Sequence, residues 1–371
     1  MTEDNWYTIK NVEKLDTPAL VIYPERVKEN INTLKGMVDN VLRVRTHVKT
    51  HKSKDATLLM LNAGFTKFKC ATIAEAEMLG ISKAPDVLLA YQPIGPKLER
   101  FIKLIKAYPD TQYSCLVDNT IAVKHISDEA LEHHIKIIVF IDLNIGMNRT
   151  GIAPGSDALA LYEYCNELPG IELIGLHAYD GQIHDADLDI RTQKCNEAFE
   201  PVKRLQQYIK GKGYPEPVII AGGSPTFPIY AKRGDVECSP GTFIYWDRGY
   251  SLICAEQPFL TAALVVSRVI SLPGETKLCL DVGHKSISAE NELGKRIHFL
   301  NAPELVIIGQ SEEHLVVEAG KDHHYKIGDV LYGLPYHVCP TIALYERAIT
   351  IENHYISGEW RNIARDRKIT V

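Results

Sequence analysis

The chain has 371 residues, which is enough for two domains, because one domain usually holds roughly 100–200 residues. Its 45% hydrophobic and 24% charged residues exclude a disordered or fibrous protein. The net charge of −6 argues against nucleic-acid binding, which needs concentrated positive charge. No apolar run approaches the ~20 residues that span a bilayer. We therefore expect a globular protein with neither a nucleic-acid nor a membrane partner.

The amino end, from Met1 to Trp6, is acidic and lacks the apolar core of a secretory signal. On this basis a cytoplasmic protein is expected. The 8 cysteines are scattered singly and form no CxxC pair. Such a pattern is typical of reduced, buried thiols that behave as small apolar residues.

The first half of the chain alternates short apolar runs with helical patterns. An apolar strand is predicted from Asp16 to Tyr23, and Pro24 begins a helix. About eight strands then follow over roughly 200 residues, an alternation typical of α/β proteins. Together with the run that ends at Lys49, the predicted strands are 65–72, 87–92, 112–117, 136–143, 171–177, 218–222 and 236–245. This pattern predicts a (β/α)8 TIM-like barrel, although a doubly wound open sheet would give a similar alternation.

After about residue 255 the helical patterns become rare and β-rich runs dominate. These runs cover 260–272, 277–282, 305–309, 315–318, 329–334 and 342–351. We therefore predict three parts: an amino-terminal strand (1–23) that joins the β-domain, a barrel (24–254) and an all-β domain (255–371).

The stretch from Arg43 to Lys52 carries two lysines and two histidines where a strand is predicted to end. Alternation would place His47, Lys49 and His51 on one face of that strand. Neighbouring positive charges lower the pKa of a lysine and can make its amine nucleophilic. Lys49 is therefore a candidate imine-forming amine. A solvated cationic edge strand is the structural alternative.

Polar residues follow several predicted strands, at the barrel end where functional groups gather. Gly222-Gly223-Ser224 follows one strand, and Ser239-Pro240-Gly241-Thr242 lies beside another. Backbone amides and hydroxyl groups in such loops can hold a phosphate, although glycine-rich strand ends are often only turns. Together with a reactive lysine, these loops suggest pyridoxal phosphate.

Near the carboxyl end, His337 and Cys339 are two residues apart, so on an extended segment they point to the same face. Imidazole and thiolate are a suitable pair of zinc ligands. A buried cysteine beside an unrelated histidine is the structural alternative. Two local ligands would leave open positions in the coordination sphere of the metal, and such open positions are typical of a catalytic metal.

The sequence resembles the D-threonine aldolase and D-serine dehydratase family. Members of this family are fold-type III pyridoxal phosphate enzymes with an alanine-racemase-like barrel. The motifs that carry the resemblance extend over nearly the whole chain: Asp16-Thr17-Pro18-Ala19, His47-x-Lys49-x-His51-Lys52, Gly146-Met147-Asn148-Arg149-x-Gly151, Tyr179-x-Gly181, Gly222-Gly223, Pro240-Gly241, Ser311-Glu312-Glu313-His314 and His337-x-Cys339.

The resemblance implies that Lys49 carries the cofactor, that Arg149 contacts its phenolic oxygen and that Tyr179 lies near its pyridine nitrogen. It also implies that His337 and Cys339 hold a divalent metal, zinc or manganese. Gly222, Gly223, Ser224, Gly241 and Thr242 would then hold the phosphate, and His47 and His184 would join the catalytic residues. His184 is displaced by about one residue from the position of a family histidine, so a surface-loop histidine is the alternative. A homodimer is typical of the family.

Two reactions on a D-β-hydroxy amino acid fit these motifs. Retro-aldol cleavage would give glycine and an aldehyde, whereas dehydration would give a keto acid and ammonia. The Gly222-Gly223 loop and the 240–243 segment favour the aldolase. A racemase has no use for a metal on the substrate hydroxyl. A non-catalytic pyridoxal phosphate carrier is usually a bare barrel, so the second domain argues against that function.

Overall fold

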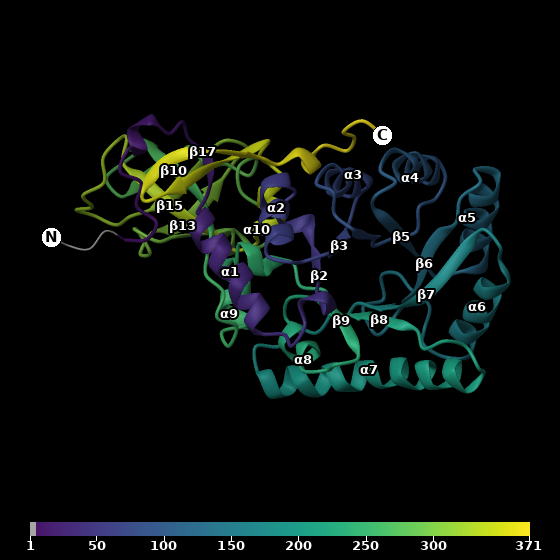
Figure 1. Cartoon of the computed structure of the whole chain (residues 1–371). Helices are drawn as coiled ribbons and strands as arrows, with labels where there is room; N and C mark the ends of the chain where they lie inside the picture. The colour runs from purple at the N-terminus through teal and green to yellow at the C-terminus, as the bar shows by residue number, and fades with distance from the viewer. Residues whose placement is uncertain (1–4) are drawn as a thin grey trace. The chain divides into compact units, whose positions relative to one another are not determined.

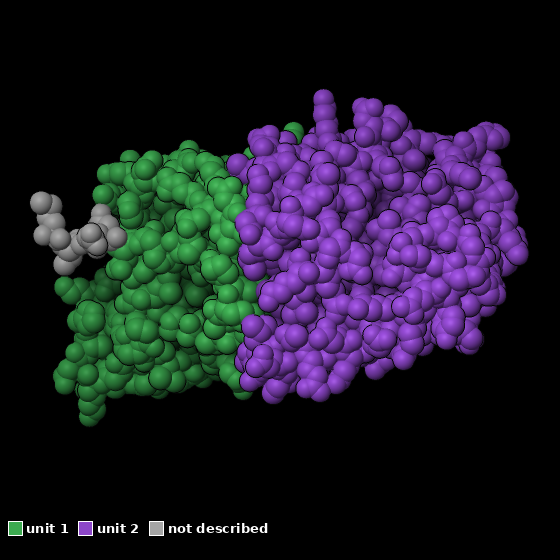
Figure 2. All heavy atoms as spheres, turned by 60° about the horizontal axis from the view of Figure 1, so that its bottom comes forward, with its two compact units in different colours: residues 1–33, 50–56, 242–365 green, residues 34–49, 57–241, 366–371 purple. Residues whose placement is uncertain are grey.

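The computed structural model describes residues 5–371. The chain divides into two compact units, drawn in different colours in Figure 2. One unit, here called the β unit, contains the residues up to 33 together with 50–56 and 242–365. The other, here called the barrel unit, contains residues 34–49, 57–241 and 366–371.

The barrel unit contains an 8-stranded sheet in which each strand pairs in parallel with the next one along the chain (Figure 1). A parallel bridge between Val44 and Cys238 joins the first strand to the last. The predicted α/β barrel is therefore confirmed. Its strands are β2 (Arg45–His47), β3 (Lys67–Cys70), β4 (Asp86–Leu89), β5 (Gln112–Val117), β6 (Ile137–Leu143), β7 (Ile171–Ala178), β8 (Val218–Ala221) and β9 (Val236–Cys238).

Helices follow the strands, as the alternation of the sequence predicts. Side-chain oxygens cap several of them: Thr72 accepts a hydrogen bond from the Glu75 N–H, and Asn119 accepts one from the Ala122 N–H. No helix within residues 5–371 is long and apolar enough to cross a membrane. The helices up to residue 231 are α1 (Pro24–Gly36), α2 (Lys54–Asn62), α3 (Ile73–Ile81), α4 (Pro96–Ala107), α5 (Thr120–Glu132), α6 (Ser156–Glu167), α7 (Leu188–Gly211) and α8 (Phe227–Ala231).

Two strands end earlier than the sequence predicts. The first predicted barrel strand was expected to reach Lys49, but β2 ends at His47 and residues Val48–Thr50 form a 3-10 turn. There the His47 Nδ1 accepts a hydrogen bond from the Lys49 N–H at 3.3 Å, a local bond that competes with a strand ladder. Similarly, the run expected to reach residue 245 ends at Cys238, because Pro240 has no N–H to donate to a ladder.

The β unit contains a 9-stranded mixed sheet, which confirms the predicted β character of the carboxyl-terminal part. β1 (Ala19–Ile22) lies in this sheet, antiparallel to β10 (Ala263–Ser271) and parallel to β16 (Arg347–Glu352). The other strands are β11 (Lys277–Leu280), β12 (Ile297–Phe299), β13 (Val306–Gln310), β14 (Leu315–Glu318), β15 (Val330–Pro335) and β17 (Tyr355–Arg361). The sequence patterns missed β12, β17 and two short helices, α9 (Arg248–Ile253) and α10 (Val338–Ile342).

Each unit has its own apolar core. In the barrel interior, Leu88, Leu116, Phe140 and Ile220 pack together from four different strands. In the β unit the core includes residues of β1, β10 and β15. Each unit therefore buries apolar surface of its own.

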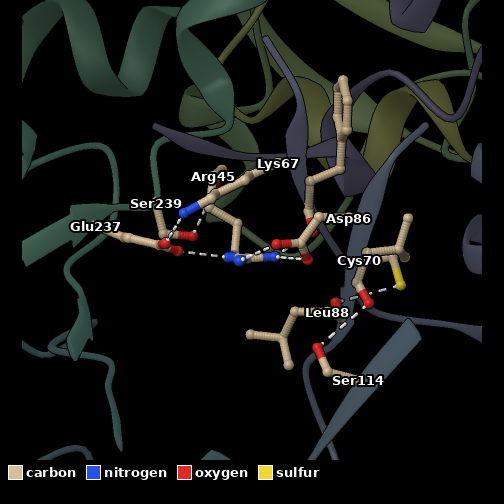
Figure 3. A network of polar contacts seen from close by, with 10 residues as sticks. Arg45, Lys67, Cys70, Asp86, Leu88, Ser114, Glu237 and Ser239 are labelled. Atoms are coloured by element: carbon tan, nitrogen blue, oxygen red, sulfur yellow. Dashed lines mark hydrogen bonds and ion pairs between the residues drawn. The ribbon is translucent and has the colours of Figure 1, made fainter. Parts of the chain in front are cut away.

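A buried ion-pair network links β2 to β4 and β9 within the barrel unit (Figure 3). The Arg45 side chain is buried, and its guanidinium donates to both carboxylate oxygens of Asp86, at 2.6 and 2.8 Å. Its Nε donates to Glu237 at 2.9 Å, and Lys67 also pairs with Glu237. The Ser239 hydroxyl donates to the Arg45 carbonyl at 3.1 Å. One arginine thus ties β2 to its neighbour β9 and, across β3, to β4.

We predict that Arg45→Met lowers the free energy of unfolding by about 3–5 kcal/mol, because it leaves two carboxylates without their buried partner. Urea denaturation followed by circular dichroism measures this loss. Lys103→Met, which breaks an exposed pair with Glu99, is the control and should change stability by no more than about 0.5 kcal/mol. Equal effects of the two substitutions would contradict a structural role for Arg45.

Candidate functional site

The barrel unit contains a cavity of about 270 Å³, and its lining includes His47 and Lys49 from the stretch between Arg43 and Lys52. Its lining comes from the carboxyl ends of several barrel strands and from the loops that follow them, which is where barrel active sites lie. The lining residues are His47, Lys49, Lys69, Ala71, Ala90, Tyr91, Leu116, Asp142, Leu143, Met147, Arg149, Thr150, His177 and Tyr179. Four residues singled out from the sequence, His47, Lys49, Arg149 and Tyr179, thus share one cavity.

The predicted alternation through His47, Lys49 and His51 is wrong beyond His47, because the 3-10 turn replaces the strand. His51 is buried and does not belong to the cavity lining. Its Nδ1 accepts a hydrogen bond from the Ser53 N–H, and burial lowers the pKa of His51 to about 3. His51 is therefore an uncharged structural residue, whereas Lys49 faces the cavity.

Two glycines leave room for the Tyr179 ring. A Cβ atom built on Gly181 would lie 2.5 Å from the Tyr179 ring, and one built on Gly223 would lie 3.1 Å from it. The Arg149 guanidinium lies 5.2 Å from the centre of the same ring, within the range of a cation–π interaction. The glycine loop, residues Gly222-Gly223-Ser224, therefore lies against Tyr179, which lines the cavity.

That glycine loop is fixed by hydrogen bonds. Gly222 has a φ of +77°, which favours glycine, and a Cβ there would contact Tyr230 at 2.6 Å. The Gly223 N–H donates to the Thr226 hydroxyl, which in turn donates to Asp180 at 2.9 Å. Burial raises the pKa of Asp180 to about 6.

The second predicted phosphate loop meets the first within the barrel unit. The Gly241 N–H donates to the Ser224 hydroxyl at 3.3 Å. A hydroxyl and a backbone amide are thus brought together from two loops, which is a donor set that suits a phosphate. With an amine in the neighbouring cavity and an aromatic ring against the loop, the residues fit pyridoxal phosphate.

A buried chain of polar groups was missed by the sequence patterns. The Lys69 Nζ lies 3.5 Å from the His177 Nε2, and the His177 Nδ1 lies 2.7 Å from the Asp142 Oδ1. The other Asp142 oxygen accepts a hydrogen bond from Thr150 at 2.8 Å. Burial acts to raise the pKa of Asp142, but the hydrogen bonds from His177 and Thr150 outweigh it and lower that pKa. Asp142 and His177 lie near the ends of predicted strands, where polar residues were expected, whereas Lys69 lies within its predicted strand and was not expected.

His184 is exposed and does not line the cavity. It lies three residues before Asp187, whose carboxylate caps the amino end of α7. The structure therefore places His184 apart from Lys49, His47 and Tyr179. Its proposed role as a base has no supporting contact.

The two predicted metal ligands lie in the β unit. The expected extended segment is wrong at Cys339: His337 has extended backbone, but Cys339 lies in the short helix α10. Their side chains nevertheless interact, and His337 also contacts the Glu290 carboxylate. Burial acts to lower the pKa of His337, but its hydrogen bonds to Cys339 and Glu290 raise that pKa to about 9.

Two threonines surround the Cys339 thiol. The Thr50 hydroxyl lies 3.2 Å from its sulfur, and the Thr242 hydroxyl lies 3.8 Å from it. Thr242, predicted as a phosphate ligand, therefore contacts the candidate metal ligand within the β unit. This contact joins segments that are far apart in the sequence, so no local pattern predicts it.

Asp247 positions the segment that carries both candidate ligands. Its buried carboxylate accepts hydrogen bonds from the Val338 and Tyr250 N–H groups, both at 2.9 Å. The Gly249 N–H donates to the Tyr336 carbonyl at 3.0 Å, and a Cβ on Gly249 would lie 2.6 Å from that oxygen. The approach of α9 to this segment therefore requires a glycine.

His337 and Cys339 supply two suitable donors for a metal, which is only part of the ligand set that a metal needs. Within residues 5–371 no group of three or more His, Cys, Asp or Glu side chains is arranged to hold a metal ion. The nitrogen and sulfur donors suit zinc, and water or substrate would have to complete its coordination.

We predict that Asp180→Asn stabilises the protein more at pH 7 than at pH 4. The folded-state pKa of about 6 lies above the ordinary aspartate pKa of 3.8, so the ionisation of Asp180 costs stability as the pH rises through this range. Asparagine keeps the acceptor for Thr226 without the charge. Urea unfolding at both pH values should show a relative gain on the order of 1–3 kcal/mol. A difference in stability that does not depend on pH would contradict this account.

Two family models match the chain. The alanine racemase N-terminal domain matches residues 22–249, and a putative serine dehydratase domain matches residues 262–351. Together these matches cover most of the barrel and much of the sheet of the β unit.

Individual proteins resemble the chain over nearly its full length. A D-threonine aldolase from Arthrobacter sp. is 26% identical, with 95% of this chain and 93% of the relative covered. A D-threo-3-hydroxyaspartate dehydratase from Delftia sp. is 25% identical, with 88% and 92% covered. The crystal structure of D-threonine aldolase from Filomicrobium marinum has a TM-score of 0.86 at 23% identity, with 94% and 95% of the two chains covered.

Proposed function

The chain belongs to the family of the alanine racemase N-terminal domain, and we propose that it is a pyridoxal phosphate-dependent lyase acting on D-β-hydroxy amino acids. The favoured reaction is retro-aldol cleavage of a D-threonine-like substrate to glycine and an aldehyde. The observation that carries this proposal is the cavity in which Lys49 lies together with Arg149 and Tyr179. The full-length similarity to a D-threonine aldolase supports the choice of reaction.

In this proposal Lys49 holds the cofactor through its amine. Tyr179 would lie near the pyridine nitrogen of the cofactor, and the absence of side chains at Gly181 and Gly223 leaves the space that the tyrosine ring occupies. Arg149 supplies a positive charge to the phenolic oxygen, and Ser224 and the Gly241 N–H bind the phosphate. Bound pyridoxal phosphate supplies an electron-withdrawing ring, which takes up the electrons of a bond broken at the substrate's α-carbon.

A divalent metal at His337 and Cys339 is the second cofactor that we propose, with zinc favoured by the thiol. When bound, it supplies a Lewis acid for the substrate hydroxyl. Thr50 and Thr242 orient the Cys339 thiol, and Asp247 holds the backbone between the two ligands. A homodimer and a cytoplasmic location are also proposed.

Dehydration to a keto acid and ammonia is the second candidate function. It is favoured by the serine dehydratase domain that matches residues 262–351 and by the similar dehydratase from Delftia sp.. The purified protein, loaded with pyridoxal phosphate and metal, should release glycine and acetaldehyde from D-threonine. Release of pyruvate and ammonia from D-serine, without cleavage of D-threonine, would favour the dehydratase. No product from either substrate would contradict both reactions and would leave the non-catalytic carrier.

We predict that Lys49→Ala abolishes the visible absorbance of the bound cofactor, because the covalent link to the protein is lost. The measurement is an absorption spectrum after gel filtration of the loaded variant. Lys52→Ala is the matched control on the same stretch and should keep the band. A persistent band in Lys49→Ala would contradict the assignment of this lysine.

We also predict that His337→Ala keeps the visible band but loses lyase activity by a factor of at least about 100, because a metal-dependent charge stabilisation is removed. His184→Ala provides a comparison, since this exposed histidine lies outside the cavity lining. Full activity of the original protein after prolonged chelation would remove the metal from the proposal.

A further inference from the structure

The charges that line the cavity are unbalanced. Lys49, Lys69 and Arg149 contribute basic side chains, and in the lining given by residues 5–371 Asp142 is the only carboxylate. Lys69 is also the only buried lysine among these residues. One lysine is enough to hold the cofactor, so the buried amine of Lys69 needs its own explanation.

The hydrogen-bond chain behind Lys69 sets the tautomer of His177. Its Nδ1 lies 2.7 Å from Asp142, and a carboxylate oxygen can only accept, so this nitrogen carries the proton. The Nε2 of the neutral imidazole is then the acceptor that faces the Lys69 amine at 3.5 Å. Burial lowers the pKa of His177, which favours this neutral form.

The surroundings of Lys69 place its titration near neutrality. Burial is the largest cause, and the Lys49 and Arg45 charges act in the same direction, while Asp142 and Asp180 act against them. The Tyr179 ring lies 5.6 Å from the ammonium position and offers only a weak cation–π contact. Together these groups lower the pKa of Lys69 to about 7.

We propose that Lys69 is a second working amine of the cavity and that it carries a proton to and from the substrate's α-carbon, with His177 and Asp142 as its positioning residues. The proposal rests on the lyase function. As the carbon–carbon bond breaks, the substrate's hydroxyl gives up its proton to water and becomes the aldehyde oxygen. The electron pair of the broken bond is left at the α-carbon, and the Lys69 ammonium donates the proton that forms the new C–H bond. The neutral Lys69 amine then takes up one proton from the solvent, which offsets the proton that the hydroxyl released. A group that titrates near the working pH is suited to such transfers.

The protonation of Lys69 can be tested without any enzymatic activity. The purified protein is labelled with trace acetic anhydride from pH 5 to pH 11, and each lysine is quantified by mass spectrometry. Lys69 should reach half of its maximal reactivity near pH 7. Lys124, whose pKa is raised by hydrogen bonding to Asp128, is the internal control and should react only at strongly alkaline pH. A Lys69 profile that follows Lys124, or no labelling of Lys69 at any pH, would overturn the proposal.

The role in proton transfer is tested by the exchange of the glycine α-protons in D2O, followed by NMR. The loaded protein should catalyse this exchange, with a rate that changes near pH 7. Lys69→Met should keep the visible cofactor band and slow the exchange about 100-fold. His177→Leu should shift the pH of the change, because leucine offers no acceptor to the Lys69 amine. Exchange by Lys69→Met at the original rate would contradict the proposal. Normal exchange by a protein that cleaves no D-β-hydroxy amino acid would instead contradict only the lyase function.

Discussion

The barrel unit depends most on the ion pairs that the buried Arg45 guanidinium forms with Asp86 and Glu237. Removing a charge from water costs several kcal/mol, so a buried arginine is tolerated only when carboxylates and hydrogen bonds surround it. Asp86 at the start of β4 and Glu237 in β9 provide that environment. β2 is thereby fixed at the place where the first and last strands meet. His47 and Lys49 follow Arg45 within four residues. The same network therefore also fixes the start of the segment that carries the cavity lysine.

The cavity that results is rich in positive charge. Lys49, Lys69 and Arg149 lie around it, while the Asp142 carboxylate is already engaged by His177 and Thr150. Such a surface attracts anions, which agrees with a phosphorylated cofactor and an amino-acid carboxylate as its proposed contents. The same positive charges add to the effect of burial, which is the larger cause of the lowered pKa of Lys69.

The sequence predicted the strands well because apolar runs and turn residues recur with the period of an α/β barrel. It failed where a local hydrogen bond or a proline overrode that pattern, as after His47 and after Cys238. The loss of alternation also removed His51 from the expected group. Cys339 was placed on an extended segment, whereas five residues after His337 form a helix whose backbone is tied to Asp247.

Among the site residues, the sequence pattern indicated Lys49 because it follows the end of a strand, whereas Arg149 and Tyr179 were indicated by the family resemblance. Lys69 was missed, since a period of two does not say which face of a strand is inside a barrel. The role of Thr242 at the phosphate stays a prediction, and its hydroxyl lies near the Cys339 thiol. Contacts between distant segments have no local signature in a single sequence.

Lys49 is proposed as the residue that holds the cofactor covalently. Reduction of the loaded protein with borohydride, followed by peptide mapping for the phosphopyridoxyl mass, tests this role. We expect this mass on the peptide that contains Lys49, and not on the peptide that contains Lys69. A modification confined to Lys69 or to a surface lysine, or no stable modification at all, would contradict it.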